Sequence, residues 1–231
     1  MNSYKSTARI VGGLFITATV ASIIGTFVFI EPIISTPDYL SNIYPNRSLL
    51  TIGVLIDAIN SVAVVAIAVL LFPIFQKHNK SLAIGYVASR IIESVILIIG
   101  HISQLSLIPL SQEFIKAKIP DVSYFLSLGS LLISVYNWTW LLGPMILLGI
   151  TALILNGTFY HSKMIPRFIS IWGFIGGLLI IVAGLFGMFG LSIKSPISIL
   201  LGLPIALNEM VLALWLIVKG FRLTDIYSKN G

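Results

Sequence analysis

Polar and ionisable side chains recur along one face of an otherwise apolar segment, GYVASRIIESVILIIGHISQ at residues 85–104. The members of this face, spaced by three or four residues, are Tyr86, Arg90, Glu93, Leu97, His101 and Gln104. On a helix they lie within about 60° of one another and extend for about 21 Å along its axis. The opposite face suits lipid and consists of Ile91, Val95, Ile98, Ile99 and Ile102. We therefore expect the polar face to meet protein or a wet cavity.

Charges inside a membrane are expensive, at about 2.5–3.5 kcal/mol each on insertion scales, so they turn inward and find partners. Arg90 and Glu93 lie three residues apart and can pair within their own helix. Asp57 and Glu209 lie in other apolar segments, so three acids share one permanent cation. A desolvated carboxyl group without a counter-charge takes up a proton or binds a cation. At least one of these acids is thus expected to be protonated at neutral pH, or to meet a cation or a cationic ligand.

The chemistry that this pattern predicts is binding of a proton, an ion, a small solute or a lipid. At about 1.5 Å per residue, Asp57 lies at the depth of His101, whereas Glu209 is nearer the membrane midplane. Glu209 or Asp57 would be the protonatable group. Arg90 would hold an anionic group or a carboxylate, and Asn60 would orient the ligand. The predicted ligand- or proton-binding residues are Asp57, Asn60, Arg90, Glu93, His101 and Glu209.

Two alternatives to a binding site stay open. In a structural or accessory protein the same charges would only fix helix packing, which predicts a dry, closed centre. In a membrane-embedded enzyme, His101 and Asp57 would act as a general acid–base pair beside an opening to lipid. The sequence has none of the familiar intramembrane enzyme patterns, such as H-E-x-x-H or G-x-S-x-G, so no catalytic residues are predicted.

No cofactor and no metal site are expected. A haem held by two histidines needs a second histidine in the membrane, and His78 and His161 lie in loops. A lone imidazole such as His101 is more often a hydrogen-bonding core residue than a ligand. The chain has no cysteine, which excludes disulfides, iron–sulfur clusters and cysteine-bound zinc. No close-spaced set of other metal ligands is present.

The composition places the chain in a lipid bilayer. It has 231 residues, of which 57% are hydrophobic and 10% charged, with a mean hydropathy of +1.03. Soluble domains carry about 25% charged residues, because their surfaces face water. The formal charge of +6 comes from residues at the ends of apolar runs, without a basic stripe for phosphates to follow, so nucleic acid is not an expected partner.

Six apolar segments are long enough to span a membrane, which takes about 20 residues. They predict an all-α, polytopic bundle of six transmembrane helices in one domain, residues 1–231, at approximately 8–30, 50–75, 81–107, 130–156, 165–190 and 197–219. The second, third and sixth of these carry the polar residues and are expected to meet at a polar centre. Residues 110–128 are interpreted as an amphipathic lead-in to the fourth span, which Gly143-Pro144 interrupts.

Basic residues predict the topology, because they gather in cytoplasmic loops. With the N-terminus inside, nine lie inside, namely Lys5, Arg9, Lys77, Lys80, Lys163, Arg167, Lys219, Arg222 and Lys229. Four lie outside, namely Arg47, Lys116, Lys118 and Lys194. Both termini are therefore predicted to be cytoplasmic, in a multi-pass protein of the cell membrane.

Two further patterns concern helix packing. Gly173, Gly177, Gly184 and Gly187 share one face of the fifth segment, where small residues let helices approach closely. Pro204 predicts a bend in the sixth segment, just before Asn208 and Glu209.

Several motifs resemble one bacterial family of membrane proteins. They are ARIVGGLF, LIDAINSVAVVAIAVLLFPIFQKHN, LAIGYVASRIIESV, IPRFISIWGFIGG and PIALNEMVLALWLIVKGF. The family is catalogued as domain of unknown function 4386, and the resemblance covers nearly the whole chain. Its pattern includes the positions of Asp57, Asn60, Arg90, Glu93 and Glu209, whereas His101 belongs to no motif of it. The resemblance implies a bacterial multi-helix membrane protein and supplies no reaction. From residues and resemblance together, we expect a ligand-binding membrane protein of transporter or sensor type.

Overall fold

The described residues form helices joined by short turns. The computed structural model describes residues 2–117, 123–192 and 195–222. The helices are α1 (Asn2–Ile23), α2 (Glu31–Ile34), α3 (Tyr39–Ile43), α4 (Arg47–Phe75), α5 (Lys80–Ala117), α6 (Ser123–Trp140), α7 (Leu148–Ser162), α8 (Arg167–Met188) and α9 (Pro196–Val218). Two π-helical segments, η1 (Ile24–Ile30) and η2 (Leu141–Leu147), continue α1 into α2 and α6 into α7.

Six of the resulting helices are long and apolar enough to cross a membrane. They are Tyr4–Ile34, Arg47–Phe75, Lys80–Ala117, Ser123–Ser162, Arg167–Met188 and Pro196–Val218. The predictions of an all-α chain and of six such helices are thus confirmed. The isoleucines opposite the polar face of α5 are about half-exposed, as a surface in contact with lipid requires.

The predicted lead-in at 110–128 is not a separate element among the described residues. Residues 110–117 are the last turns of α5, and 123–128 are the first turns of α6. Tertiary contacts explain why α5 continues past Pro109. The Ser111 hydroxyl donates to the Leu40 carbonyl, and the rings of Phe114 and Phe125 lie 5.9 Å apart.

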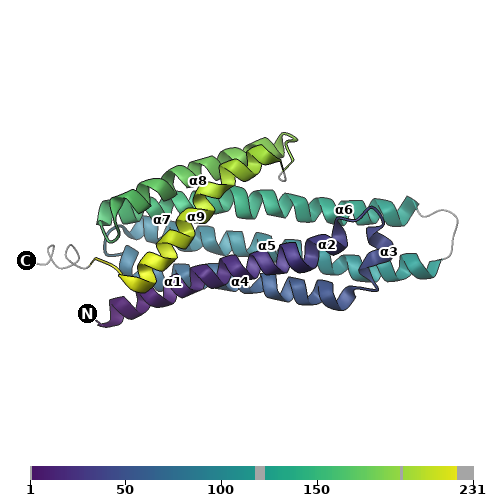
Figure 1. The fold of residues 1–231 in the computed structure, drawn as a ribbon, viewed down its shortest axis with the longest axis horizontal. Coiled ribbons are helices and arrows are strands. Elements are labelled where there is room, and N and C mark those ends of the chain that lie inside the picture. Colours follow the sequence, from purple (N-terminus) through teal and green to yellow (C-terminus); the bar gives the residue numbers. More distant parts are fainter. Residues whose placement is uncertain (1, 118–122, 193–194, 223–231) are drawn as a thin grey trace, which may run out of the picture. The chain divides into compact units, whose positions relative to one another are not determined.

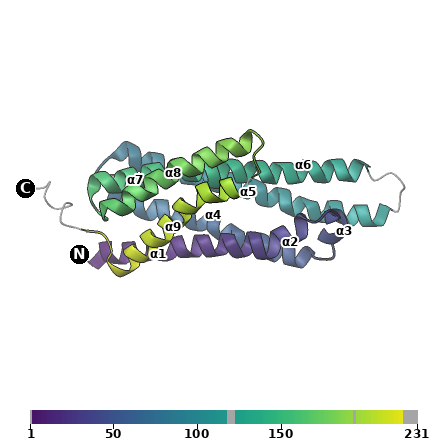
Figure 2. The same cartoon turned by 45° about the horizontal axis from the view of Figure 1, so that its top comes forward.

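The chain divides into two compact units. Unit 1 consists of residues 1–16, 63–94 and 141–231, and unit 2 consists of residues 17–62 and 95–140. In unit 1, α8 packs against both α7 and α9, and the three helices lie side by side in Figures 1 and 2. Its core is rich in aromatic rings, with centroids 5.3 Å apart for Phe75 and Phe159 and 5.7 Å for Phe75 and Tyr86.

Glycines allow the close packing of α8. A Cβ atom on Gly177 would lie 3.1 Å from Ala152 Cβ, and one on Gly184 would lie 2.7 Å from Ile146 Cδ1. A Cβ atom on Gly173 would collide with the side chains of Asn156 and Asn208. The prediction that these three glycines serve helix packing is therefore confirmed.

In unit 2, α5 and α6 run antiparallel. The Ser103 hydroxyl donates to the Leu132 carbonyl at 2.7 Å, and Gly100 lies against Thr139. The core of this unit includes Ile30, Ile43, Leu50, Val54, Leu107 and Tyr136. Asn42 Nδ2 donates to the Ile33 carbonyl at 3.2 Å and so joins the short helices α2 and α3.

Candidate functional site

The polar face predicted for residues 85–104 is buried. Because α5 is unbroken from Lys80 to Ala117, the spacing of three and four residues holds its members on one side. Each member is less than 9% exposed, namely Tyr86, Arg90, Glu93, Leu97, His101 and Gln104. The sequence pattern therefore identified the inward side of α5 correctly.

In unit 1, Arg90 lies between two carboxylates. Its Nη1 donates to both oxygens of Glu93, at 3.1 Å and 3.0 Å. Its Nη2 lies 3.8 Å from Oε1 of Glu209, which α9 brings to this place. The Arg90 and Glu93 side chains are 1% and 4% exposed, whereas that of Glu209 is 17% exposed. Glu209 is thus the more loosely held and more accessible acid.

The charges of this cluster do not cancel. With all three groups ionised, one arginine and two glutamates leave a net charge of −1. The Tyr86 ring, with its centroid 5.7 Å from the guanidinium carbon, adds a cation–π contact that favours the arginine charge. Arg90 Nε has no hydrogen-bond partner among the described residues. A buried cluster with this imbalance favours uptake of one positive charge.

In unit 2, Asp57 of α4 meets His101 of α5. Asp57 Oδ2 lies 2.9 Å from His101 Nε2, and both residues are 7% exposed. This contact agrees with the equal depth that residue counting gave them. Asp57 Oδ1 has no hydrogen-bond partner among the described residues, so the carboxylate keeps capacity for one further donor.

The backbone of η1 lies directly against the Asp57 segment. A Cβ atom on Gly25 would be 2.7 Å from the backbone nitrogen of Asp57 and 2.7 Å from the carbonyl oxygen of Gly53. Asn60, one turn further along α4, is half-buried and makes no hydrogen bond with the described residues. Glycine at position 25 therefore lets η1 cover the aspartate.

Five of the six predicted residues enter two sets of contacts, and Asn60 enters neither. Arg90, Glu93 and Glu209 join α5 to α9 in unit 1, and Asp57 and His101 join α4 to α5 in unit 2. That all six form one centre stays a prediction. Within the described ranges, no three acidic or histidine side chains gather closely enough to hold a metal ion.

Sequence reasoning missed a second set of polar groups in unit 1. Asn156, Ser170 and Asn208 are each at most 1% exposed. Asn208 Nδ2 donates to the Ile169 carbonyl at 2.8 Å, and Asn156 Nδ2 donates to the Ala152 carbonyl at 2.9 Å. Their Oδ1 atoms and Ser170 Oγ have no partner among the described residues. Uncharged and scattered over three helices, they form no spacing pattern, and only the burial of polar groups could have indicated them.

A family model described as "Domain of unknown function (DUF4386)" matches residues 10–220. The chain belongs to the DUF4386 family. The matched range holds both sets of ionic contacts and all six candidate spans except the first residues of α1. No curated protein and no solved structure matches this DUF4386 chain. It is a multi-pass membrane protein with buried salt bridges, one of which joins two helices in each unit.

Proposed function

We propose that this DUF4386 protein binds a proton or a small monovalent cation at Glu209. The observation that supports this most directly is that two carboxylates share the Arg90 guanidinium, and that one of them lies further from it than the other. Glu93 receives two hydrogen bonds of about normal length, whereas the contact of Glu209 is 3.8 Å long. One bound positive charge would bring the cluster from −1 to zero.

The other residues have supporting roles in this proposal. Arg90 donates two hydrogen bonds to Glu93 and places a positive charge near the second acid. Asp57 with His101 is a separate protonatable pair, and Asn60 is an amide that can orient a solute. We limit the proposal to binding, because binding is the step that transporters and sensors share.

In the cluster around Arg90, the structural alternative rests on weak contacts between helices. Both short bonds of Arg90 go to Glu93 on its own helix, three residues away, so they do not tie helices together. Among the ion pairs of the described residues, the 3.8 Å contact with Glu209 is the one that links α5 to α9. An ion pair within one helix typically contributes about 0.2–0.5 kcal/mol, which is small against the cost of burying it.

We further propose one transmembrane domain in the cell membrane, with both termini in the cytoplasm. The helix ends of unit 1 that carry Lys5, Lys77, Lys163, Arg167 and Arg222 support this orientation. Lys77 Nζ donates to the Tyr4 hydroxyl at 2.6 Å, which joins the end of α4 to α1, and the Arg222 amide donates to the Met164 carbonyl at 2.8 Å, which joins the residues after α9 to the turn before α8. Lys118, Lys194 and Lys229 lie outside the described residues.

The test is the thermal unfolding of purified protein in detergent, across pH 5–9 and in sodium, potassium or choline chloride at equal ionic strength. The melting temperature of the wild type is expected to rise with acid and with a bound cation. Glu209→Gln mimics the protonated acid and should abolish both dependences while remaining at least as stable. Glu113→Gln is the matched control, because Glu113 is 64% exposed and pairs with Lys116 at the surface.

Wild-type dependence on pH and cations that survives in Glu209→Gln would refute the assignment to Glu209. A wild type that responds to neither would favour the structural alternative.

A further inference from the structure

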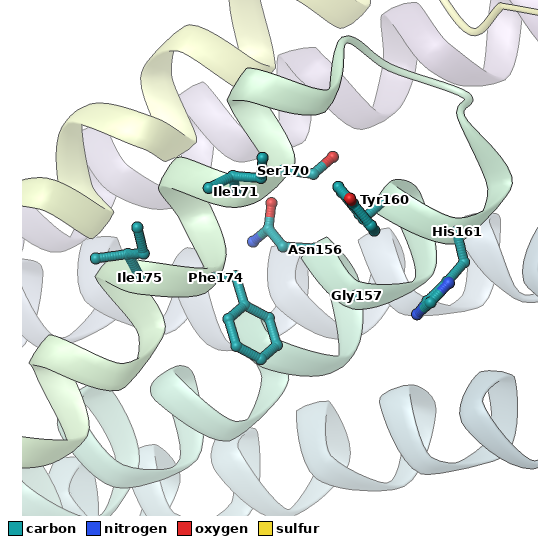
Figure 3. A pocket seen from close by; sticks show the side chains of 8 residues that line it. All are labelled: Asn156, Gly157, Tyr160, His161, Ser170, Ile171, Phe174 and Ile175. Atoms are coloured by element: carbon teal, nitrogen blue, oxygen red, sulfur yellow. The ribbon is translucent and has the colours of Figure 1, made fainter.

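A pocket of about 270 Å³ opens between α7 and α8 in unit 1 (Figure 3). It is separate from the residues of the proposed function. Asn156 lies near its centre in Figure 3, between the side chains of Ile171 and Phe174, with Ser170 beside it. The lining therefore combines the buried polar side chains of Asn156 and Ser170 with an apolar wall.

The polar lining residues have unmet hydrogen-bonding capacity. Asn156 is 1% exposed and Ser170 is 0% exposed. Within the part of the chain that the structure describes, neither Asn156 Oδ1 nor Ser170 Oγ has a hydrogen-bond partner. Buried polar atoms in native structures almost always have a partner, so these two point to one that is not part of the chain. That partner needs a donor for Asn156 Oδ1 and either a donor or an acceptor for Ser170 Oγ.

The pocket lies near the ends of two helices that belong to candidate membrane spans. Ser170 lies three residues after the start of α8 at Arg167, which is about 5 Å along the axis. Asn156 lies six residues before the end of α7 at Ser162, about 9 Å. Phe174 and Ile175, further along α8, are about half-exposed and belong to a candidate span. The apolar wall therefore faces acyl chains while the polar groups lie near the interface.

The rim of the pocket is basic. His161 and Tyr160 line it, and the Arg167 guanidinium lies 5.3 Å from the centroid of the Tyr160 ring. Lys163 lies in the loop between the two helices, and the sequence from Asn156 to Ile175 contains no acidic residue. The charge at this rim fits an anionic partner.

We propose that this pocket binds an anionic phospholipid whose headgroup carries hydroxyl groups, with phosphatidylglycerol as the representative ligand. A headgroup hydroxyl would donate to Asn156 Oδ1 and accept from Ser170 Oγ. The phosphate would lie toward Arg167, and the acyl chains would lie on Phe174 and Ile175. Phosphatidylcholine carries no net charge, because its choline group balances the phosphate. Phosphatidic acid lacks the headgroup hydroxyls.

The test is lipid titration of delipidated protein in detergent, followed by native mass spectrometry, with phosphatidylglycerol, phosphatidic acid and phosphatidylcholine of identical acyl chains. Phosphatidylglycerol should bind about tenfold more tightly than either of the others, which is about the effect of one hydrogen bond to a buried polar group. Ser170→Ala and Asn156→Leu should remove this advantage over phosphatidic acid. Arg167→Gln should weaken both anionic lipids and leave phosphatidylcholine unchanged.

Ser89→Ala is the matched control, because Ser89 is a buried serine of the same unit whose hydroxyl donates to the Tyr86 carbonyl at 3.0 Å. It should leave all three affinities unchanged. Ser170→Ala removes a hydroxyl without a protein partner, so it should fold normally and decides the question even if Asn156→Leu does not fold.

Equal binding of phosphatidylglycerol and phosphatidylcholine would overturn the proposal. So would a phosphatidylglycerol preference that Ser170→Ala leaves intact, since water would then be the partner of the buried oxygens. Competition by glycerol phosphate as strong as by the lipid itself would overturn the lipid identification in favour of a soluble anion.

Discussion

Arg90 of α5 and Glu209 of α9 face each other across 3.8 Å, while the same guanidinium binds both oxygens of Glu93 on its own helix. The interhelical contact is therefore the longer one, and the intrahelical contact is the stronger. Because the two contacts differ in strength, removal of Arg90, of Glu93 or of Glu209 should change the stability of the protein by different amounts.

Removal of Arg90 alone should be strongly destabilising. Arg90→Met leaves the buried Glu93 without a counter-charge, so the free energy of unfolding should fall by about 3–5 kcal/mol. Arg90→Met combined with Glu93→Leu should recover most of this loss, because the remaining acid, Glu209, is partly exposed and can take up a proton. Unfolding of both variants in mixed detergent micelles measures the two values. A double variant as unstable as the single one would mean that the charges themselves hold the helices in place.

The Asp57–His101 contact should appear as a coupling energy. A double-mutant cycle with Asp57→Asn and His101→Gln is expected to give about 1.5–3 kcal/mol, typical of a hydrogen bond to a charged group. Asn60→Ala is the control on the same helix. Because Asn60 is half-buried and has no hydrogen bond with the described residues, its replacement should change stability by at most about 0.5 kcal/mol. A coupling near zero would show that the two side chains do not interact in the membrane.

Gly25 should not tolerate a methyl group. In Gly25→Ala the new Cβ would lie 2.7–2.8 Å from backbone and side-chain atoms of Asp57 and Gly53, so η1 must move away from α4. We expect a loss of about 1–3 kcal/mol, as for an overpacked core. Gly13→Ala, in α1, meets nothing within 4 Å and should stabilise the protein by up to about 1 kcal/mol. Thermal unfolding of both variants provides the comparison, and equal effects would contradict the close approach of η1.

The topology can be tested with introduced cysteines, because the natural chain has none. Lys80 and Lys116 lie near opposite ends of α5. A membrane-impermeant maleimide should label Lys116→Cys in intact cells, and Lys80→Cys only after the cells are permeabilised. The reverse labelling pattern would place both termini outside the cell.

The inward face of α5 could be predicted because its spacing follows the helical period and lipid excludes charged groups from the other side. Counting residues also matched the depths of Asp57 and His101. Residue counting could not show which polar residues of α5 contact α4 and which contact α9, because helix neighbours depend on crossing angles set by packing. Residues 110–117 are predicted to lead into the fourth span, yet they continue α5, where Phe114 contacts Phe125 of α6. The unpartnered oxygens of Asn156 and Ser170 became visible only once the backbone enclosed them.

The length of α5 has a mechanical consequence. Its 38 residues extend for about 57 Å, whereas the hydrocarbon layer is about 30 Å thick. A tilt of about 60° would be needed to submerge it, beyond the 0–40° that membrane helices adopt. The ends of the helix therefore extend beyond the hydrocarbon layer; at one end Glu113 and Lys116 are exposed and the ring of Phe114 lies edge-on to Phe125 of α6. A strongly hydrophobic chain thus presents a charged helix end outside the hydrocarbon layer, where water-soluble reagents can reach it without crossing that layer.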